Sequence, residues 1–448
     1  MTVDPVTADP ESAVTSPDFA AITADLMTRI DQLCLLTEVP GTVQRTFLST
    51  TAARMHAALS AWALELGLDA WVDAAGNWHA ALPGPTPDAP TFIIGSHLDT
   101  VPDGGKYDGL LGVALGLALA GTLKRGGATL PYRLEVLGFS EEEGVRFGVP
   151  FIGSLSALGE AGSMLGLRDP AGVSVEEAMR DFGLDPARLP DAALAGPHLG
   201  FLEFHIEQGP VLEAAGQPLG VVTALVGHHR LKITLTGRAN HAGTTPMGLR
   251  QDALTAAAEW MLAAETLARA TPGLVATVGQ LQVFPGASNV IPGRAELTLD
   301  LRHQDDNLRA ARLTELEAAL HEIGDRRGVQ TQAEVLTMIP AVPLDASLLA
   351  GLHRAAAETG LSAPELVSGA GHDAMIMSRA MPAAMLFLRT PGGLSHHPDE
   401  AVAPGDVQAA LEVGWRFLLG LAAGPNSDQP NADQPDANQP DADQGEQA

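Results

Sequence analysis

Short apolar strands alternate with helices along most of this chain, and one stretch in the middle breaks that order. Apolar segments at residues 92–94, 132–139, 201–206 and 384–388 are predicted strands, and residues 110–123 are a predicted buried helix. Strands separated by helices are typical of a layered unit with a mainly parallel sheet. The pattern therefore predicts an α/β fold.

The interrupting stretch runs from residue 222 to residue 339 and has a different order of elements. It reads strand, helix, strand, strand, helix, strand, over residues 230–236, 252–268, 276–283, 295–301, 308–323 and 330–336. That order defines the split βαβ, ferredoxin-like motif. We expect a second, α+β domain that is inserted into the first and forms a lid over a cleft.

The expected domain boundaries follow from these patterns and from the composition of the two ends. Residues 1–18 and 425–448 are acidic, contain Pro and few large apolar side chains, and are expected to be disordered tails. The α/β domain is then expected at residues 19–221 and 340–424, with the inserted domain at 222–339.

Composition narrows the classes of partner and compartment. With 54 Asp and Glu against 26 Lys and Arg, the formal net charge is −28, which argues against nucleic acid or an anionic membrane as partner. The one cysteine, Cys34, excludes an intramolecular disulfide and a cysteine metal cluster, and a buried apolar role is expected for it. The N-terminus resembles no signal peptide, and the longest apolar run is too short to span a bilayer. These features predict a soluble, cytoplasmic protein.

Histidines and carboxylates gather at the ends of the predicted strands. In GSHLDT, His97 and Asp99 are two residues apart on a strand and therefore share one side of it, and Asp108 follows in a glycine-rich loop. In an open α/β sheet, ligands bind at the carboxyl ends of the strands. An Asp beside a metal-binding His can fix the tautomer of that His. Taken alone, however, this segment is more typical of a structural His and a turn Asp.

The segment SEEEGVRFG directly follows the strand that ends at Phe139. Three adjacent carboxylates, on Glu141, Glu142 and Glu143, repel one another unless a cation holds them. A solvated loop is the alternative interpretation. An adjacent Glu pair can instead supply one metal ligand and one general base that activates water.

Two further histidine segments complete the pattern. FLEFHIEQG places His205 in a strand that ends at Glu207 and Gln208, and GGLSHHPDE places His396 and His397 in a loop rich in Gly and Pro. A lone His at either place is more often structural. Together, the segments offer three imidazoles, two carboxylates and a further base. That set suits two divalent ions bridged by one carboxylate.

The segments also resemble a known enzyme family. GSHLDTVPDGGKYDGLLGV, FSEEEGVRFG, FLEFHIEQGPVLE, NHAGTTPM, NVIPGR, SGAGHDAM and GGLSHHP occur in that order. This set is similar to the amidase/carbamoylase branch of the dinuclear zinc peptidase–aminoacylase family, which includes allantoate amidohydrolase and N-carbamoyl-L-amino-acid hydrolase. The resemblance implies a catalytic domain with a lid, a homodimer formed through the lid, and two divalent ions per subunit. Zn or Mn is expected, and Co or Ni would also accept these ligands.

The resemblance implies a role for each candidate by its position. The metal ligands would be His97 and His205 on one ion, Glu143 and His396 on the other, and Asp108 bridging both. Glu142 resembles the general base, which takes a proton from water and later delivers it to the departing nitrogen. Asp99 resembles the residue that orients His97, and Glu141 receives no catalytic part. In this family, Asn or Ser often follows the histidine that is the last metal ligand, whereas here His397 follows His396. Either imidazole could therefore be the ligand, and we favour His396.

The inserted domain supplies further candidates by resemblance. His241 resembles the lid histidine that stabilises the oxyanion, and in this family that residue can reach the active site of the other subunit. The expected substrate contacts are Asn289 and Arg302, which resemble a pair that grips the substrate carboxylate, and, more weakly, Gln208 and His372. Each of these could instead be an ordinary turn or strand residue. The pair His228 and His229 is expected to be the ordinary start of a strand.

The implied activity is hydrolysis of a linear amide or ureido C–N bond in a small anionic substrate. The segments GGKYDGLLGV, EEEGVRFG and PLGVVTA are slightly more similar in sequence to allantoate amidohydrolases than to carbamoylases. That would make this an enzyme of purine breakdown that releases ammonia and carbon dioxide. N-carbamoyl amino acids, including the β-ureido acid of pyrimidine breakdown, are the alternative substrates. An aminoacylase, a peptidase or an inactive metal-binding homologue comes after them.

Overall fold

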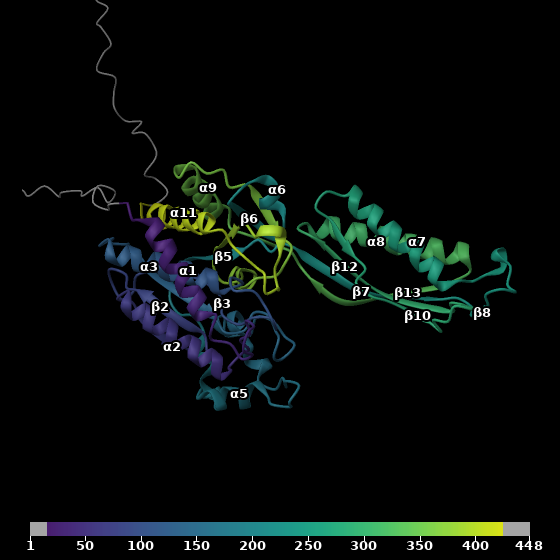
Figure 1. The fold of residues 1–448 in the computed structure, drawn as a ribbon, viewed down its shortest axis with the longest axis horizontal. Coiled ribbons are helices and arrows are strands. Elements are labelled where there is room, and N and C mark those ends of the chain that lie inside the picture. Colours follow the sequence, from purple (N-terminus) through teal and green to yellow (C-terminus); the bar gives the residue numbers. More distant parts are fainter. Residues whose placement is uncertain (1–15, 424–448) are drawn as a thin grey trace, which may run out of the picture.

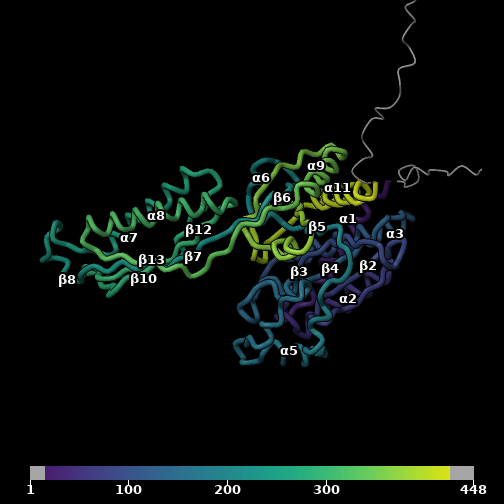
Figure 2. Tube along the Cα trace, turned by 180° about the vertical axis from the view of Figure 1, so that it is seen from behind, coloured from purple at the N-terminus to yellow at the C-terminus, as the bar shows by residue number. Residues whose placement is uncertain are grey.

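The computed structural model describes residues 16–423, which form two lobes (Figures 1 and 2). Of the tails predicted from the sequence, residues 1–15 and 425–448 lie outside the described residues. Among residues 16–423, no helix combines the length and the apolar character that crossing a membrane requires.

The larger lobe is built on one mixed sheet. Its strand order is β1-β2-β4-β3-β5-β16-β6-β14, and β15 pairs with β6 beside that path. The strands are β1 (Asp69–Val72), β2 (Trp78–Leu82), β3 (Thr91–His97), β4 (Arg133–Phe139), β5 (His198–Ile206), β6 (Leu219–Leu225), β14 (Val342–Pro343), β15 (Glu365–Ser368) and β16 (Ala383–Leu388). The four central strands, β4, β3, β5 and β16, run parallel to one another. The predicted α/β fold with a mainly parallel sheet is therefore confirmed.

The central strands are apolar on both sides because helices and loops cover both faces. On β3, Phe92 and Ile94 belong to the core beneath the long helices, whereas Ile93 between them belongs to a second core on the opposite face. Alternation of side chains along a strand sends neighbouring residues to opposite faces. A strand buried on both sides therefore has a continuous apolar sequence, which is why it could be predicted from so short a segment.

Five longer helices pack around this sheet. They are α1 (Phe19–Leu33), α2 (Thr50–Glu65), α3 (Leu110–Arg125), α9 (Ala346–Glu358) and α11 (Pro404–Ala423). The shorter ones are α4 (Ile152–Ala157), α5 (Val175–Phe182), α6 (Val211–Ala215) and α10 (Asp373–Met377). Helix α3 is buried from Leu110 to Leu123 and packs on β3, β4 and β5. A side chain in place of Gly112 would lie 2.3 Å from the backbone oxygen of Phe204, so glycine permits this close approach.

The smaller lobe projects from one edge of the larger one (Figure 1). It contains a sheet in the order β10-β12-β7-β13, with β9 also paired to β12. Its elements are β7 (Gly227–Thr236), β8 (Asn240–His241), α7 (Ala253–Ala270), β9 (Val275–Thr277), β10 (Leu281–Phe284), β11 (Val290–Ile291), β12 (Arg294–His303), α8 (Asp306–Arg327) and β13 (Gln330–Ile339). All pairs in this sheet are antiparallel, and the order of elements is that of the ferredoxin-like motif.

One strand of the smaller lobe differs from its predicted form. The segment expected at residues 276–283 is divided into β9 and β10. Thr277 pairs with Asp300, and Leu281 pairs with Leu297. The segment therefore advances by four residues where β12 advances by three. The extra residue around Gly279 interrupts the ladder, as in a β-bulge.

The two faces of the smaller sheet have different characters. Apolar side chains from β7 and β12 pack under α7 and α8, and Trp260 of α7 is fully enclosed there. The opposite face carries no helix and presents charged side chains, among them Arg230, Asp300 and Arg302. Strands β6 and β14, which pair with each other, lie at the base of the smaller lobe and lead into and out of it.

Candidate metal centre

The residues predicted as ligands lie where the central parallel strands end. Because β3, β4, β5 and β16 are parallel neighbours, their carboxyl ends open onto one edge of the sheet. His97 is the last residue of β3, and His205 is the penultimate residue of β5. Both residues are 1% exposed, so they are almost fully buried.

The tautomers of the two histidines follow from their hydrogen bonds. Nδ1 of His97 is 3.0 Å from the backbone oxygen of Asp99, and Nδ1 of His205 is 2.9 Å from the backbone oxygen of Ile206. A carbonyl oxygen can only accept, so each Nδ1 donates a hydrogen. In a neutral imidazole, Nε2 then carries a lone pair.

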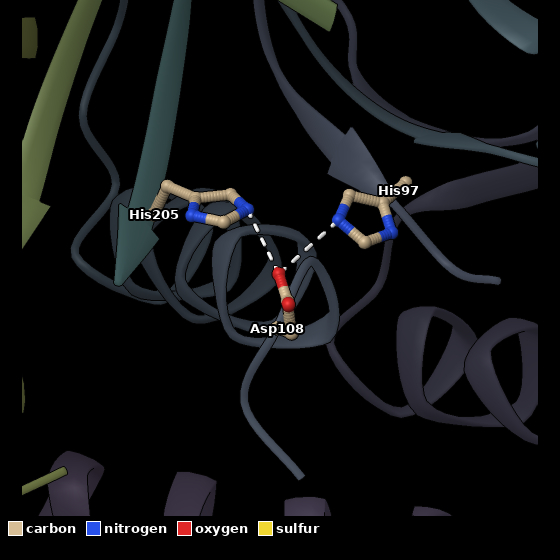
Figure 3. Close-up of side chains that lie close together, drawn as sticks. All are labelled: His97, Asp108 and His205. Carbon is tan, nitrogen blue, oxygen red and sulfur yellow. Dashed lines mark ion pairs between the residues drawn. The ribbon is translucent and has the colours of Figure 1, made fainter. Parts of the chain in front are cut away.

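Both of these nitrogens lie close to one carboxylate oxygen. Oδ1 of Asp108 is 3.1 Å from Nε2 of His205 and 3.4 Å from Nε2 of His97 (Figure 3). Within the described residues, Asp108 Oδ1 and His205 Nε2 are buried and have no hydrogen-bond partner. Buried polar atoms almost always have one. Acceptors gathered in this way fit a divalent cation bound among them.

The pKa values show how strongly these groups attract positive charge. Burial raises the pKa of Asp108, but His205, His396 and His97 outweigh burial and hold it well below its usual range. Burial lowers the pKa of His205, yet the Asp108 carboxylate raises it overall. A metal ion at this point would meet the same attraction.

A glycine makes the position of Asp108 possible. Gly109, the residue before α3, has φ of +68°, a conformation that side chains disfavour. A Cβ on Gly109 would lie 2.5 Å from Nδ1 and from the backbone oxygen of His97. The chain therefore passes directly beneath His97 and presents Asp108 to it.

The other oxygen of Asp108 faces a second group. Oδ2 is 3.3 Å from Nε2 of His396, and that nitrogen is 3.6 Å from Oε1 of Glu143. One ligand atom from each of these three residues lies within 4.8 Å of the others. Asp108 thus stands between two clusters, one on each oxygen, which is the arrangement expected of a bridging carboxylate.

The structure also separates the two neighbouring histidines of the last motif. Nδ1 of His397 accepts a hydrogen bond from the backbone nitrogen of Asp399 at 3.1 Å, and His397 belongs to neither cluster. His396 has φ of +54°, a left-handed conformation uncommon outside glycine, and this turns its ring toward Asp108. The geometry therefore favours His396 as the ligand.

The carboxylate of Asp99 contacts the glutamate loop more closely than the imidazole of His97. Its two oxygens accept hydrogen bonds from the backbone nitrogens of Glu142 at 2.9 Å and Glu143 at 3.0 Å. The carboxylate is 3.5 Å from Nδ1 of His97, whereas the backbone oxygen of Asp99 is closer. Asp99 orients His97 through its backbone and positions the glutamate loop through its side chain.

Glu142 is buried and lies with His97 and Glu143 in a cluster of possible ligand atoms. Burial raises its pKa well above the usual range, although His97 opposes the shift. Burial also raises the pKa of Glu143 to about 7 and that of Glu141 to about 9. Glu141 lies outside the metal-type clusters found among the described residues. A carboxylate whose pKa is raised by its surroundings suits proton transfer near neutral pH.

Gln208 and His372, the weaker candidates for substrate contact, both border this centre. Nε2 of Gln208 donates to Oδ2 of Asp108 at 3.0 Å, from a left-handed backbone with φ of +59°. The ring of His372 lies 4.3 Å from that of His205, and its Nε2 is 2.9 Å from Oγ of Ser368. Both side chains are therefore within reach of a molecule bound at the centre.

The candidate residues of the smaller lobe, His241, Asn289 and Arg302, lie at two separate places. His241 on β8 is exposed at the far end of the smaller lobe, and β8 pairs with β11, directly after Asn289. Arg302 lies near the other end of β12, where its Nη1 donates to the backbone oxygen of Gly369 in the larger lobe at 2.6 Å. Strand β12 begins at Arg294, five residues after Asn289. From Arg294 to Arg302 the strand extends about 26 Å, at about 3.3 Å per residue. The structure does not bring Asn289 and Arg302 together within one chain.

Several residues that shape this centre were not singled out from the sequence. Asp300 holds Arg302 through two contacts of 2.8 and 2.9 Å, and it also accepts from Arg230 at 2.9 Å. Glu203 is fully buried beneath His205, and Glu400 contacts the loop of Asp108. Asp300 and Glu203 stand two residues before Arg302 and His205, so strand periodicity could have revealed them. Glu400 offered no comparable signal beyond its place in the HHPDE segment.

Three comparisons relate the chain to known proteins. A profile of the peptidase family M20/M25/M40 matches residues 93–421. The chain is 38% identical over 421 residues to a probable allantoate deiminase of Oryza sativa subsp. japonica, covering 85% of each chain. It is also 38% identical over 386 residues to the N-carbamoyl-L-amino acid amidohydrolase of Geobacillus stearothermophilus, covering 86% of this chain and 94% of that one. Among solved structures, a hydantoinase/carbamoylase family amidase from Burkholderia ambifaria superposes with a TM-score of 0.84 at 34% identity, covering 89% of this chain and 97% of that one.

Proposed function

The chain belongs to peptidase family M20/M25/M40, and from that membership we propose that it hydrolyses a ureido C–N bond of allantoate. The reaction class is a metal-dependent hydrolysis of a carbon–nitrogen bond other than a peptide bond. The observation that carries the proposal is the position of Asp108 between two clusters of imidazole and carboxylate ligands.

These ligands suit two divalent ions, and Zn or Mn is proposed. His97 and His205 would hold one ion, Glu143 and His396 the other, and Asp108 would contact both. When bound, such ions polarise a carbonyl group and make water a stronger nucleophile. The remaining chemistry falls to side chains around the centre.

We assign the proton transfers to Glu142. It takes a proton from water as the oxygen attacks the ureido carbonyl, and it then gives this proton to the nitrogen that leaves with the rest of the substrate. The C–N bond breaks in that second step. The products are ureidoglycine and a carbamate, which decomposes to ammonia and carbon dioxide.

The substrate carboxylate is assigned to Arg302. A guanidinium binds a carboxylate through paired hydrogen bonds. The N–H donors of Arg302 that bond neither Asp300 nor Gly369 lie at the junction of the two lobes. Asp300 already occupies Nε and Nη2 of Arg302, so it fixes the plane of the guanidinium. Binding at this point would hold the distant carbonyl at the metal centre.

We propose that His241 and Asn289 act in the site of a second copy of the chain. Both lie at the far end of the lid, while Arg302 lies at its base. A dimer formed through the lids would bring these distant ends to each other's larger lobe. Strand β13 is at one edge of the lid sheet and exposes Val335, Leu336 and Met338, which supports pairing along this strand. In that dimer, His241 would donate to the developing oxyanion.

The choice of allantoate as substrate rests on the amino-acid sequences of the motifs and on the similarity to a probable allantoate deiminase. The second candidate substrate class is N-carbamoyl amino acids, including β-ureidopropionate, because a relative of that name is equally identical to the chain. Both classes pair one carboxylate with a ureido group, so Arg302 and the metal centre would serve either.

A substrate panel tests the proposal. The purified protein is freed of metal by chelation, reloaded with Zn, Mn, Co or Ni, and assayed for ammonia release from allantoate, N-carbamoyl amino acids and β-ureidopropionate. The proposal expects metal-dependent release that is fastest with allantoate. Faster turnover of an N-carbamoyl amino acid would reassign the substrate, and turnover that survives complete removal of metal would refute the reaction class.

A further inference from the structure

We propose that Glu400 is a positioning residue that couples the loop of Asp108 to the loop of His396 and so sets the spacing of the metal ligands. This inference rests on the proposed metal centre. Glu400 is 4% exposed and lies between the two loops, 292 residues from Asp108 along the chain.

One oxygen of Glu400 holds the backbone at Asp108. Oε1 accepts hydrogen bonds from the backbone nitrogens of Tyr107 at 2.9 Å and of Asp108 at 3.1 Å. A Cβ added to Gly105 would lie 2.1 Å from that same oxygen. The loop therefore carries glycine at a place where a side chain would clash with the carboxylate.

The other half of Glu400 holds the loop of His396. Oε2 lies 3.1 Å from Oγ of Ser395, the residue directly before His396. The backbone nitrogen of Glu400 donates to the backbone oxygen of His397 at 3.0 Å, which closes a turn behind His396. His396 has the uncommon φ of +54°, and such backbone persists only where the surroundings determine it. Glu400 and Ser395 constrain it from both sides.

The hydroxyl of Ser395 lies between the carboxylates of Glu400 and Asp108. Its Oγ is 3.3 Å from Oδ2 of Asp108 and 3.1 Å from Oε2 of Glu400, and one hydroxyl proton can serve only one of them at a time. Oδ2 of Asp108 already receives a hydrogen from Gln208 at 3.0 Å. Oε2 of Glu400 is the nearer of the two oxygens, so the Ser395 proton is assigned to Glu400, which then accepts three hydrogens from the two loops.

Glu400 lies outside the clusters that could hold a metal among the described residues. Its oxygens are directed at backbone and hydroxyl donors, and so it acts on the ions through Asp108 and His396. Residues that support metal ligands in this way typically change metal affinity by ~10–100-fold when they are removed.

The test measures metal binding rather than turnover. The metal-free wild type, Glu400→Ala and Glu400→Gln are titrated with Zn or Co against a chromophoric chelator, and the affinity of each ion is obtained. Glu400→Ala should lose roughly 10–100-fold in affinity. Glu400→Gln should stay close to the wild type, because its amide oxygen can still accept from both backbone nitrogens and its amide nitrogen can donate to Ser395.

A matched control removes a carboxylate of the same kind elsewhere. Oδ1 of Asp345 also accepts from two backbone nitrogens, those of Ser347 and Leu348, at the start of α9. Asp345→Ala should lower the midpoint of thermal unfolding without changing metal affinity. Ser395→Ala, which removes one link only, should weaken binding less than Glu400→Ala.

Two results would overturn the role of Glu400. One is wild-type metal affinity in Glu400→Ala, and the other is equal weakening in Glu400→Ala and Glu400→Gln. A Glu400→Ala protein that fails to fold leaves Glu400→Gln and Ser395→Ala to decide, since wild-type affinity in Ser395→Ala would also count against the link. If the wild type itself binds no ion, the proposed function fails instead.

Discussion

Nε2 of His205 lies 3.1 Å from Oδ1 of Asp108, and neither buried atom has a hydrogen-bond partner within the described residues. In the neutral form of His205, Nδ1 donates to a backbone oxygen and Nε2 is an acceptor, so two acceptors lie close together. That relationship is unfavourable unless positive charge lies between them. It connects the local geometry to the proposed chemistry, since the same two atoms would be ligands of one ion.

Replacing Glu142 by Gln should leave the metal ions in place and remove turnover. The amide keeps the size of the side chain but cannot take up a proton from water, and loss of such a group typically costs ~10²–10⁴ in rate. The measurement is kcat together with the metal content of the same sample. Wild-type kcat in Glu142→Gln would assign the base to another residue.

Replacing Arg302 by Ala should raise KM and change kcat little. Hydrogen bonds to charged groups contribute about 1.5–3 kcal/mol, which corresponds to roughly 10–100-fold in KM. Arg230→Ala is the matched control because Arg230 also donates to Asp300, whereas the hydrogen bond to the backbone of Gly369 is made by Arg302. The carboxylate clamp would be contradicted by an unchanged KM in Arg302→Ala, or by an equal rise in both variants.

A mixed dimer tests whether His241 acts across subunits. Glu142→Gln and His241→Ala subunits are co-expressed with different tags, and the mixed dimer is isolated. One of its two sites then has both Glu142 and a partner's intact lid, so it should show about half of the wild-type activity, while each parent stays nearly inactive. A mixed dimer as inactive as its parents would place His241 in its own subunit's site.

The stability of the larger lobe should depend on pH through His79. This buried imidazole lies 2.8 Å from Glu135 and 3.3 Å from Asp73, and these carboxylates outweigh burial and raise its pKa to about 9. A raised pKa adds stability that is complete below about pH 6.5 and is lost as the pH rises through about 9, which amounts to about 3 kcal/mol.

The check is urea unfolding of the metal-free wild type and His79→Gln between pH 6 and pH 10. The difference in free energy of unfolding between them should shrink as the pH rises. A difference that stays constant over this range would mean that His79 is neutral in the folded protein.

Local sequence was enough to predict the central strands, because a strand buried on both faces has a continuous apolar run, as β16 does along its length and β3 does from Phe92 to Ile94. It was also enough for the positions of the ligands, since His97 and His205 stand where such strands end. The division of β9 from β10 was missed although the extra residue near Gly279 shifts the apolar alternation, which passes from Ala276 and Val278 to Leu281 and Val283. Contacts between distant segments were beyond sequence reasoning. The pairing of Glu400 with Asp108 and the separation of Asn289 from Arg302 both depend on how the folded chain places them.

Metal content per chain is the most direct test of the account. The wild type, reloaded with Zn or Mn after chelation and freed of excess ions, should contain two divalent ions per chain by elemental analysis. Asp108→Ala should lose affinity for both ions, because each of its carboxylate oxygens faces one cluster. A wild type that binds no ion, or an Asp108→Ala variant that keeps two ions at wild-type affinity, would contradict the bridging role of Asp108 and the proposed function built on it.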